Sequence, residues 1–132
     1  MLSNIGNLLL FINILLGIFV IYLCIKNLNN SKKLISENIY HTCTFQSTSI
    51  IICFLTLVAA FIVSDFSLIT VYQNSHSLKP IFYKISGTWG NHEGSLLLWV
   101  IILTIFSFLF FINSKNHPKN YRIYTLIVQN IL

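Results

Sequence analysis

The sequence predicts an all-α integral membrane protein with three transmembrane helices and the start of a fourth. Of its 132 residues, 55% are hydrophobic and 8% are charged, whereas a soluble domain carries about 25% charged residues. Three apolar runs approach or reach the roughly 17–25 residues that cross a hydrocarbon core of about 30 Å. Because lipid offers backbone groups no hydrogen-bond partners, we expect these runs to be helices despite their many β-branched residues.

The first expected helix covers about residues 5–25, where Asn7 and Asn13 are the strongly polar members. The residues before it carry no positive charge and no clear A-x-A site follows it, so we expect a retained helix and not a cleaved signal. The second expected helix covers about residues 48–65 and ends at Ser64-Asp65. It contains the shortest of the three apolar runs, and the alternative is that it draws on Phe66 or on residues before Thr48 to reach a spanning length.

The third expected helix covers about residues 95–112. A short basic linker follows this helix and contains Pro118, which is a helix breaker. The segment 121–132 after the linker looks like the start of a fourth helix. This partial helix would rise only about 18 Å at 1.5 Å per residue, so it cannot cross the membrane alone. We expect it to lie on the membrane, to dock against a partner chain, or to belong to a larger protein. Residues 1–132 are expected to form one membrane unit.

Lysine and arginine are distributed unevenly over the linkers. With three spans, the first and third linkers share one face of the membrane and carry Lys26, Lys32, Lys33, Lys115, Lys119 and Arg122. The other face holds the N-terminus and the linker 66–94, with Lys79 and Lys84. The positive-inside rule therefore predicts that the N-terminus and this linker lie on the outer, positive side. The basic residues are scattered over the linkers and form no stripe or arm, which argues against nucleic acid as a partner.

The stretch ISGTWGNHEGSLLLW, residues 85–99, concentrates unusual residues before the third apolar run. His92 and Glu93 lack the further ligands at helical spacing that a metal site needs, and His92 could supply one haem ligand at most. Ser95 is too close to His92 to form a triad. We favour a helix start in which Asn91 is the N-cap and Glu93 faces the positive end of the helix dipole.

Other residues near this stretch are also expected to be structural. Trp89 and Trp99 are expected to anchor the chain at the membrane interface, with a haem-stacking platform as the alternative. Gly90 and Gly94 form a small-xxx-small pair if the helix begins early. Asp65 is expected to be a solvated helix end, with pairing to Lys84 or Lys79 as the alternative. The three cysteines form no CxxC pair, so we expect no disulfide framework.

These motifs carry a specific resemblance. The string W-G-x-H-E-G-S-L-L-L-W, here Trp89 to Trp99, together with NIGNLLL near the start, resembles the N-terminal region of CcmF. CcmF is the haem lyase subunit of cytochrome c maturation system I, and a related bacterial subunit for nitrite reductase haem attachment shares the region. A further shared run is Asp65, Phe66, Val71, Asn74, Ser75, Leu78 and Pro80. Lys79 separates Leu78 from Pro80, which is a small departure.

The resemblance extends over essentially all of the chain and implies a polytopic membrane protein with its N-terminus on the positive side. It implies a role in joining reduced haem to the CxxCH thiols of apocytochrome c as thioether bonds. The family's tryptophan-rich haem-handling string is absent, and none of the family's haem-binding histidines maps onto His41, His76, His92 or His117. We therefore expect no haem ligand, metal ligand or complete catalytic site in this chain.

The leading expectation is an N-terminal piece of a split CcmF-type haem lyase, a scaffold for haem-binding parts on other chains. The implied partners are the remaining CcmF-like chains, a CcmE-like haem chaperone, a CcmH-like thiol subunit, apocytochrome c and the lipid bilayer. Heavy use of Ile, Asn, Phe, Lys and Tyr favours an organellar genome and the mitochondrial inner membrane, with the bacterial inner membrane as the alternative. A structural accessory subunit of a respiratory complex is the alternative function. The residues expected to serve structure and assembly are Trp89, Gly90, His92, Glu93, Gly94, Ser95, Trp99 and Asp65.

Overall fold

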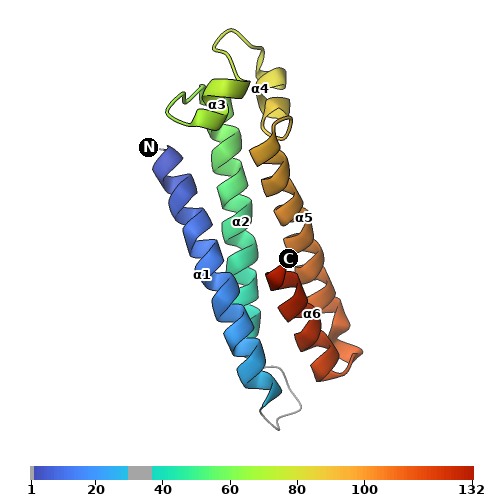
Figure 1. Cartoon of the computed structure of the whole chain (residues 1–132). Coiled ribbons are helices and arrows are strands. Elements are labelled where there is room, and N and C mark those ends of the chain that lie inside the picture. Colours follow the sequence, from blue (N-terminus) through green and yellow to red (C-terminus); the bar gives the residue numbers. More distant parts are fainter. Residues whose placement is uncertain (1, 30–36) are drawn as a thin grey trace.

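A computed structural model of the chain describes residues 2–29 and 37–132. Three long helices, α1 (Leu2–Leu28), α2 (Glu37–Val63) and α5 (His92–Asn113), run side by side (Figure 1). Two short helices, α3 (Ile69–Asn74) and α4 (Ile81–Gly87), lie at one end of this bundle, called here the loop end. At the opposite end, called the turn end, a 3₁₀ turn (Ser114–Asn116) leads into α6 (Lys119–Ile131), which runs back along the bundle.

The described residues contain three helices long and apolar enough to cross a membrane. They are α1, α2 and α5, and at 1.5 Å per residue the shortest of them rises about 33 Å. All the regular structure assigned in the described ranges is helical, which confirms the predicted fold class. Lys32 and Lys33, on which the predicted orientation partly depends, lie outside the described residues.

The helices extend beyond the apolar runs that predict them. The largest difference is in α2, which begins at Glu37 and not near Thr48. Its added turns bury Ile39 and Cys43 in a cluster completed by α1, α5 and α6. Packing against these neighbours therefore continues the helix through a polar segment that hydropathy alone assigns to a linker.

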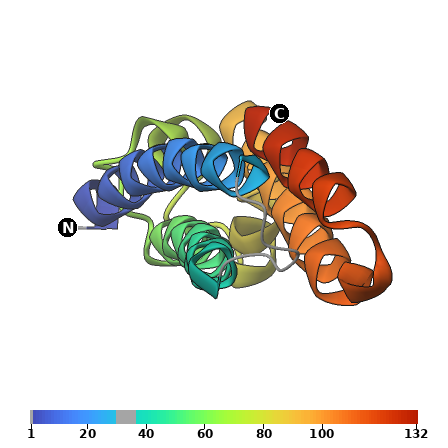
Figure 2. The ribbon, with the colours of Figure 1, turned by 90° about the horizontal axis from the view of Figure 1, so that it is seen from below.

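The core of the turn end consists of one cluster from four helices. Its buried members are Val20, Cys24, Ile39, Cys43, Phe111, Ile123 and Leu126. Seen from below, α6 lies against α1 and α5 (Figure 2). The partial fourth helix expected from the sequence is thus docked within the chain, on its own neighbouring helices.

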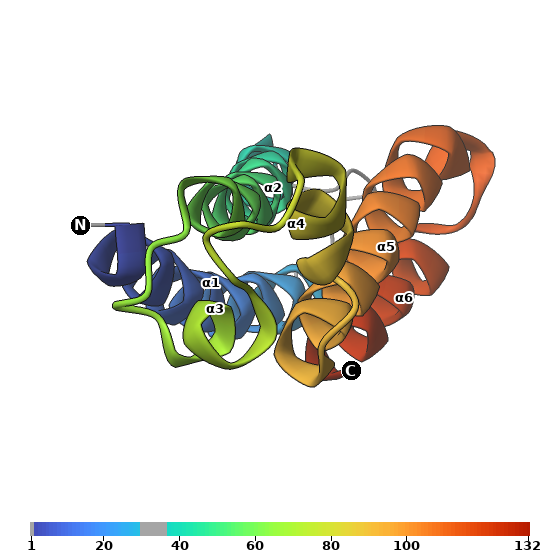
Figure 3. The ribbon, with the colours of Figure 1, turned by 90° about the horizontal axis from the view of Figure 1, so that it is seen from above.

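The linker 66–94 contains the two short helices α3 and α4, which the sequence analysis did not predict (Figure 3). Their hydrophobic contacts are few, and the buried cluster here is Ala60, Phe61 and Val71. Pro80 precedes α4 as its N-cap residue, where the missing N–H and the fixed φ do no harm. This arrangement places the end of α2 beside α4 and the start of α5.

Candidate functional site

Asn91 organises the start of α5 as the N-cap residue that the sequence predicts. Its Oδ1 accepts a 2.7 Å hydrogen bond from the Gly94 N–H. Its Nδ2 donates to the carbonyl oxygens of Gly87 at 2.8 Å and Thr88 at 3.1 Å. One buried amide therefore joins the end of α4 to the start of α5 and satisfies the backbone groups at the junction.

Gly94 is the tightest point of this junction. A Cβ added to it would overlap the carbonyl oxygen of Thr88 and lie 2.8 Å from the carbonyl carbon. The residue it would meet is backbone, so no side-chain rotation can relieve the contact. Gly90 lies outside α5, which begins at His92, so the small-xxx-small pair expected for an early helix start does not form. A Cβ at Gly90 would lie 3.2 Å from the Ser86 carbonyl oxygen, a milder contact.

The polar side chains that follow the cap face outward. His92, Glu93 and Ser95 are exposed on the first turn of α5, where Glu93 lies at the positive end of the helix dipole. The Ser95 hydroxyl donates to the His92 carbonyl oxygen at 2.9 Å. Within residues 2–29 and 37–132, no group of three or more His, Cys, Asp or Glu residues could hold a metal ion. The Asn91 cap and the hydrogen bond from Ser95 to His92 lie together in this first turn.

The two tryptophans flank the cap and present large surfaces. Trp89 is 43% exposed just before α5, and Trp99 is 57% exposed on it. Trp99 lies seven residues after His92, about 10 Å further along the helix axis. Exposed indoles at these two depths suit an interface between membrane and water, where aromatic side chains are enriched.

The end of α2 reverses through a Schellman motif centred on Ser64. Ser64 has a φ of 59°, its N–H bonds to the Phe61 carbonyl, and the Asp65 N–H bonds to the Ala60 carbonyl. Asp65 then accepts hydrogen bonds from the Ser67 hydroxyl at 2.6 Å and the Ser67 N–H at 3.2 Å. These bonds, the hydroxyl one first, hold the pKa of the Asp65 carboxyl below its usual value.

Lys84 bonds to the end of α2 and not to Asp65. Its Nζ donates to the Ser64 hydroxyl at 2.6 Å and to the Ile62 carbonyl at 3.5 Å, while Lys79 donates to the Asn74 carbonyl. The Lys84 side chain is buried. A positive charge at a helix C-terminus interacts favourably with the helix dipole and the unpaired carbonyls. The sequence assigned Lys84 to topology and, as an alternative, to pairing with Asp65, and it did not reveal this role at the end of α2.

Replacing Lys84 by methionine is expected to destabilise the loop end by about 1–3 kcal/mol. This is the range for losing a charge-assisted hydrogen bond together with a favourable interaction between a cation and the helix dipole. Equilibrium unfolding in mixed micelles measures the change. Lys79→Met is the matched control, because Lys79 is exposed and makes one surface hydrogen bond. Equal effects of the two substitutions would contradict a special role for Lys84.

Two further cations cap helix ends at the turn end. The Lys119 Nζ donates to the Asn27 carbonyl at the end of α1 at 2.6 Å. Arg122 is 6% exposed and donates to the Phe111 carbonyl at 2.9 Å. Together with Lys84, these residues place a cation on the last turn of each membrane-spanning helix. Sequence reasoning missed this role, although an arginine inside the apolar segment after Pro118 is a signal for it.

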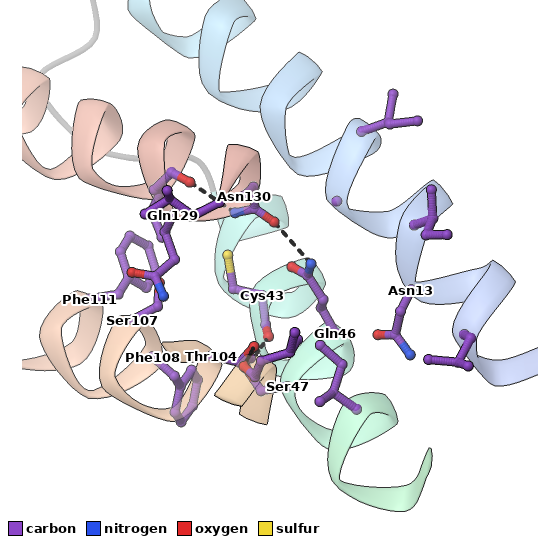
Figure 4. Close-up of a pocket in the computed structure, with 18 of the residues that line it drawn as sticks. Asn13, Cys43, Gln46, Ser47, Thr104, Ser107, Phe108, Phe111, Gln129 and Asn130 are labelled. Carbon is purple, nitrogen blue, oxygen red and sulfur yellow. Dashed lines mark hydrogen bonds between the residues drawn. The ribbon is translucent and has the colours of Figure 1, made fainter. Parts of the chain in front are cut away.

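A mostly apolar cavity with several amide and hydroxyl groups in its lining lies between α1, α2, α5 and α6, at the level where α6 ends (Figure 4). It has a volume of about 400 Å³. Gln46 donates to Asn130 at 2.9 Å across it, and Gln129 donates to the Leu103 carbonyl. On α1, Asn13 donates to the Ser49 hydroxyl at 2.9 Å. Carboxamides of α2 and α6 thus join α6 to α2 and α5, and the Asn13 amide joins α1 to α2.

The chain is similar to bacterial cytochrome c-type biogenesis proteins. It is 50% identical over 76 residues to CycK of Rhizobium meliloti, a match that covers 58% of this chain and 11% of that protein. It is 46% identical over 65 residues to CcmF of Escherichia coli, which covers 49% of this chain and 10% of that protein. The probable biogenesis protein NrfE of Escherichia coli is 46% identical over 65 residues, 49% of this chain and 12% of that protein.

These matches confirm the resemblance to CcmF-type proteins over about half of the chain, less than the essentially whole chain over which the motifs suggest it. The chain spans about a tenth of the length of the curated relatives it matches. No family model and no solved structure matches it.

Proposed function

We propose that this chain is a membrane scaffold in cytochrome c maturation, forming the first helices of a CcmF-type haem lyase assembly. The observation that carries the proposal is the 40–53% identity, over about half of the chain, to relatives named as cytochrome c-type biogenesis proteins. Those relatives are about ten times longer than the matched segment. We propose that the haem chemistry belongs to polypeptide outside these residues.

The geometry of the loop end supports a scaffolding role. The buried Asn91 amide at the start of α5 bonds to the backbone of Gly87, Thr88 and Gly94. His92 lies exposed at the edge of this turn and not in an enclosed pocket. Such a junction holds α2, α4 and α5 in one geometry, against which haem-bearing helices of a companion chain can pack.

The proposed location is the mitochondrial inner membrane, with the bacterial inner membrane as the alternative, and the loop end on the outer, positive side. On the outer side, Lys84 is buried and bonds to the end of α2. Fewer exposed Lys and Arg side chains remain on that side, as the positive-inside rule favours. The proposed partners are the remaining CcmF-like chains, a CcmE-like haem chaperone, a CcmH-like thiol subunit and apocytochrome c. Haem belongs to the assembled complex.

Depletion of this chain in its host is expected to reduce covalent haem in c-type cytochromes while b-type cytochromes keep theirs. Haem staining of denaturing gels measures the loss, because thioether-bound haem survives denaturation, and the wild-type chain should restore it. Normal haem attachment after depletion would contradict the proposal. Co-purification adds a second arm: maturation proteins are expected, whereas oxidase or cytochrome bc subunits would favour an accessory subunit of a respiratory complex.

A further inference from the structure

An apolar groove runs along the loop-end half of the bundle between α1 and α5. It has a volume of about 420 Å³, and its sides are α1 and α5, with α2 as its floor. Leu10, Leu97 and Val100 line both this groove and the cavity between α1, α2, α5 and α6, so the two spaces are adjacent. The helix pairs in extensive contact include α1 with α2 and α2 with α5 but not α1 with α5. We call this space the loop-end groove.

The turn-end half of the same space is filled by α6. This helix contacts α1 and α5 and ends about halfway along the bundle (Figure 1). Asn130 of α6 lies close to Gly17 of α1, since a Cβ added to Gly17 would be 3.6 Å from the Asn130 Oδ1. Gln129 of α6 bonds to the backbone of α5. The established occupant of this space is therefore a helix antiparallel to α5, held by small residues and amides.

The face of α1 that lines the groove has the composition of a helix-packing surface. The residues of α1 that line the groove and the cavity are Ser3, Gly6, Asn7, Leu10, Asn13, Ile14, Gly17 and Ile18. Most of the small and polar residues in the first two-thirds of α1 are in this set. Gly6 precedes Gly17 by about three helical turns and so lies on the same face. Small residues permit close backbone approach between membrane helices, and amides join them by hydrogen bonds.

The walls of the groove also carry polar groups that a lipid chain cannot satisfy. Glu93 lines its outer mouth, Ser3 and Asn7 line its α1 side, and Thr70 of α3 also borders it, whereas the Thr56 hydroxyl on its floor already donates to the Cys53 carbonyl. A hydrocarbon chain offers these groups no hydrogen bonds, whereas a helix with a hydroxyl, amide or basic side chain does. A symmetric pairing through this face would set one groove against another and would leave both unfilled.

We propose that the loop-end groove binds a transmembrane helix of another polypeptide in the complex, lying end to end with α6. The helix is apolar, with small side chains toward α1 and a hydrogen-bond donor near Glu93. The identification of that polypeptide as a maturation subunit rests on the proposed function, whereas the groove itself does not.

Photo-crosslinking in native membranes tests this assignment. A benzoylphenylalanine at Leu96 or at Val100, which are 47% and 41% exposed in the groove, is expected to crosslink to one apolar peptide of another polypeptide. Because these positions are one turn apart, their crosslinked sites should also lie about one turn apart. Ile102 is the matched control, since it is 43% exposed on the same helix but outside the groove.

The possible outcomes are distinct. Crosslinks to a second copy of this chain, to lipid alone, or equally from Ile102 would overturn the groove assignment. A crosslinked helix from an oxidase or cytochrome bc subunit would support the groove and overturn the proposed function. Val100→Trp, which fills the groove, is expected to reduce the Leu96 crosslink at least tenfold, and Ile102→Trp should leave it unchanged. The crosslinking positions are exposed, so their result holds even if Val100→Trp does not fold.

Discussion

Replacing Gly94 by alanine is expected to lower the free energy of unfolding by about 3 kcal/mol. The new methyl group would overlap the Thr88 carbonyl, which must move, and overpacking of this kind costs about 1–3 kcal/mol. Moving Thr88 also disturbs the Asn91 hydrogen bonds at the helix start, and loss of an N-cap costs about 0.5–2 kcal/mol. Unfolding in mixed micelles, followed by tryptophan fluorescence, measures the change close to its origin. Both tryptophans of the chain flank the cap.

Gly6→Ala is the matched control for this substitution. A Cβ at Gly6 would make an ordinary contact of 3.7 Å with the Thr56 hydroxyl, and both glycines lie within helices. Both substitutions raise helix propensity by up to about 1 kcal/mol, so their difference isolates the steric effect. Gly94→Ala with wild-type stability would show that α5 does not approach Thr88 this closely. In the host, Gly94→Ala should also reproduce the loss of covalent haem caused by depletion.

The sequence predicts the three membrane-spanning helices because their signal is local: each is an apolar run, and lipid leaves a helix as the only solution. The N-cap at Asn91 is equally local, because it depends on one side chain and the following turn. The signal for the start of α2 at Glu37 is not local, because Ile39 and Cys43 are buried by α6, a segment distant in sequence. Hydropathy cannot foresee such a partner, so the predicted helix begins too late.

The roles of the basic residues show a similar limit. Counting Lys84 and Arg122 by linker predicts an orientation in the membrane, but a count does not reveal that each cation is buried on a helix end. That role depends on φ at Ser64, on the carbonyl groups left free by α2 and α5, and on the packing that brings α4 and α6 beside them. The small-xxx-small pair of Gly90 and Gly94, expected for an early helix start, does not form for a related reason, because α5 begins two residues after Gly90.

Replacing Arg122 by methionine is expected to release α6 from the bundle and to cost about 3 kcal/mol. The guanidinium donates to the Ser114 hydroxyl at 3.0 Å, the Tyr40 hydroxyl at 2.8 Å and the Phe111 carbonyl at 2.9 Å. It also lies 4.9 Å from the centre of the Phe111 ring. Methionine keeps much of the volume but leaves buried polar groups without a donor, and each such group costs about 1–3 kcal/mol.

The free cysteines report the result by position. Cys24 and Cys43 are buried in the cluster that α6 completes, whereas Cys53 is buried between α1 and α2, away from it. Arg122→Met is therefore expected to raise the rate of maleimide labelling of Cys24 and Cys43 at least tenfold while Cys53 stays protected. Equal labelling of all three would indicate global unfolding, and unchanged protection of Cys24 and Cys43 would show that Arg122 does not hold α6.

Tyr40→Phe distinguishes the contribution of the hydrogen bonds around Arg122 from that of its positive charge. It removes one hydrogen bond to Arg122 but keeps the ring, which packs at a tilt against Phe111 with a centroid distance of 4.4 Å, so a loss of about 1 kcal/mol is expected. Arg122→Lys should fall between the two, because lysine keeps the charge but cannot present a planar fork to three acceptors. If lysine restores full stability, the cation alone holds the end of α5, as Lys84 does for α2; if it does not, the geometry of the guanidinium is what joins α2, α5 and α6 into one unit.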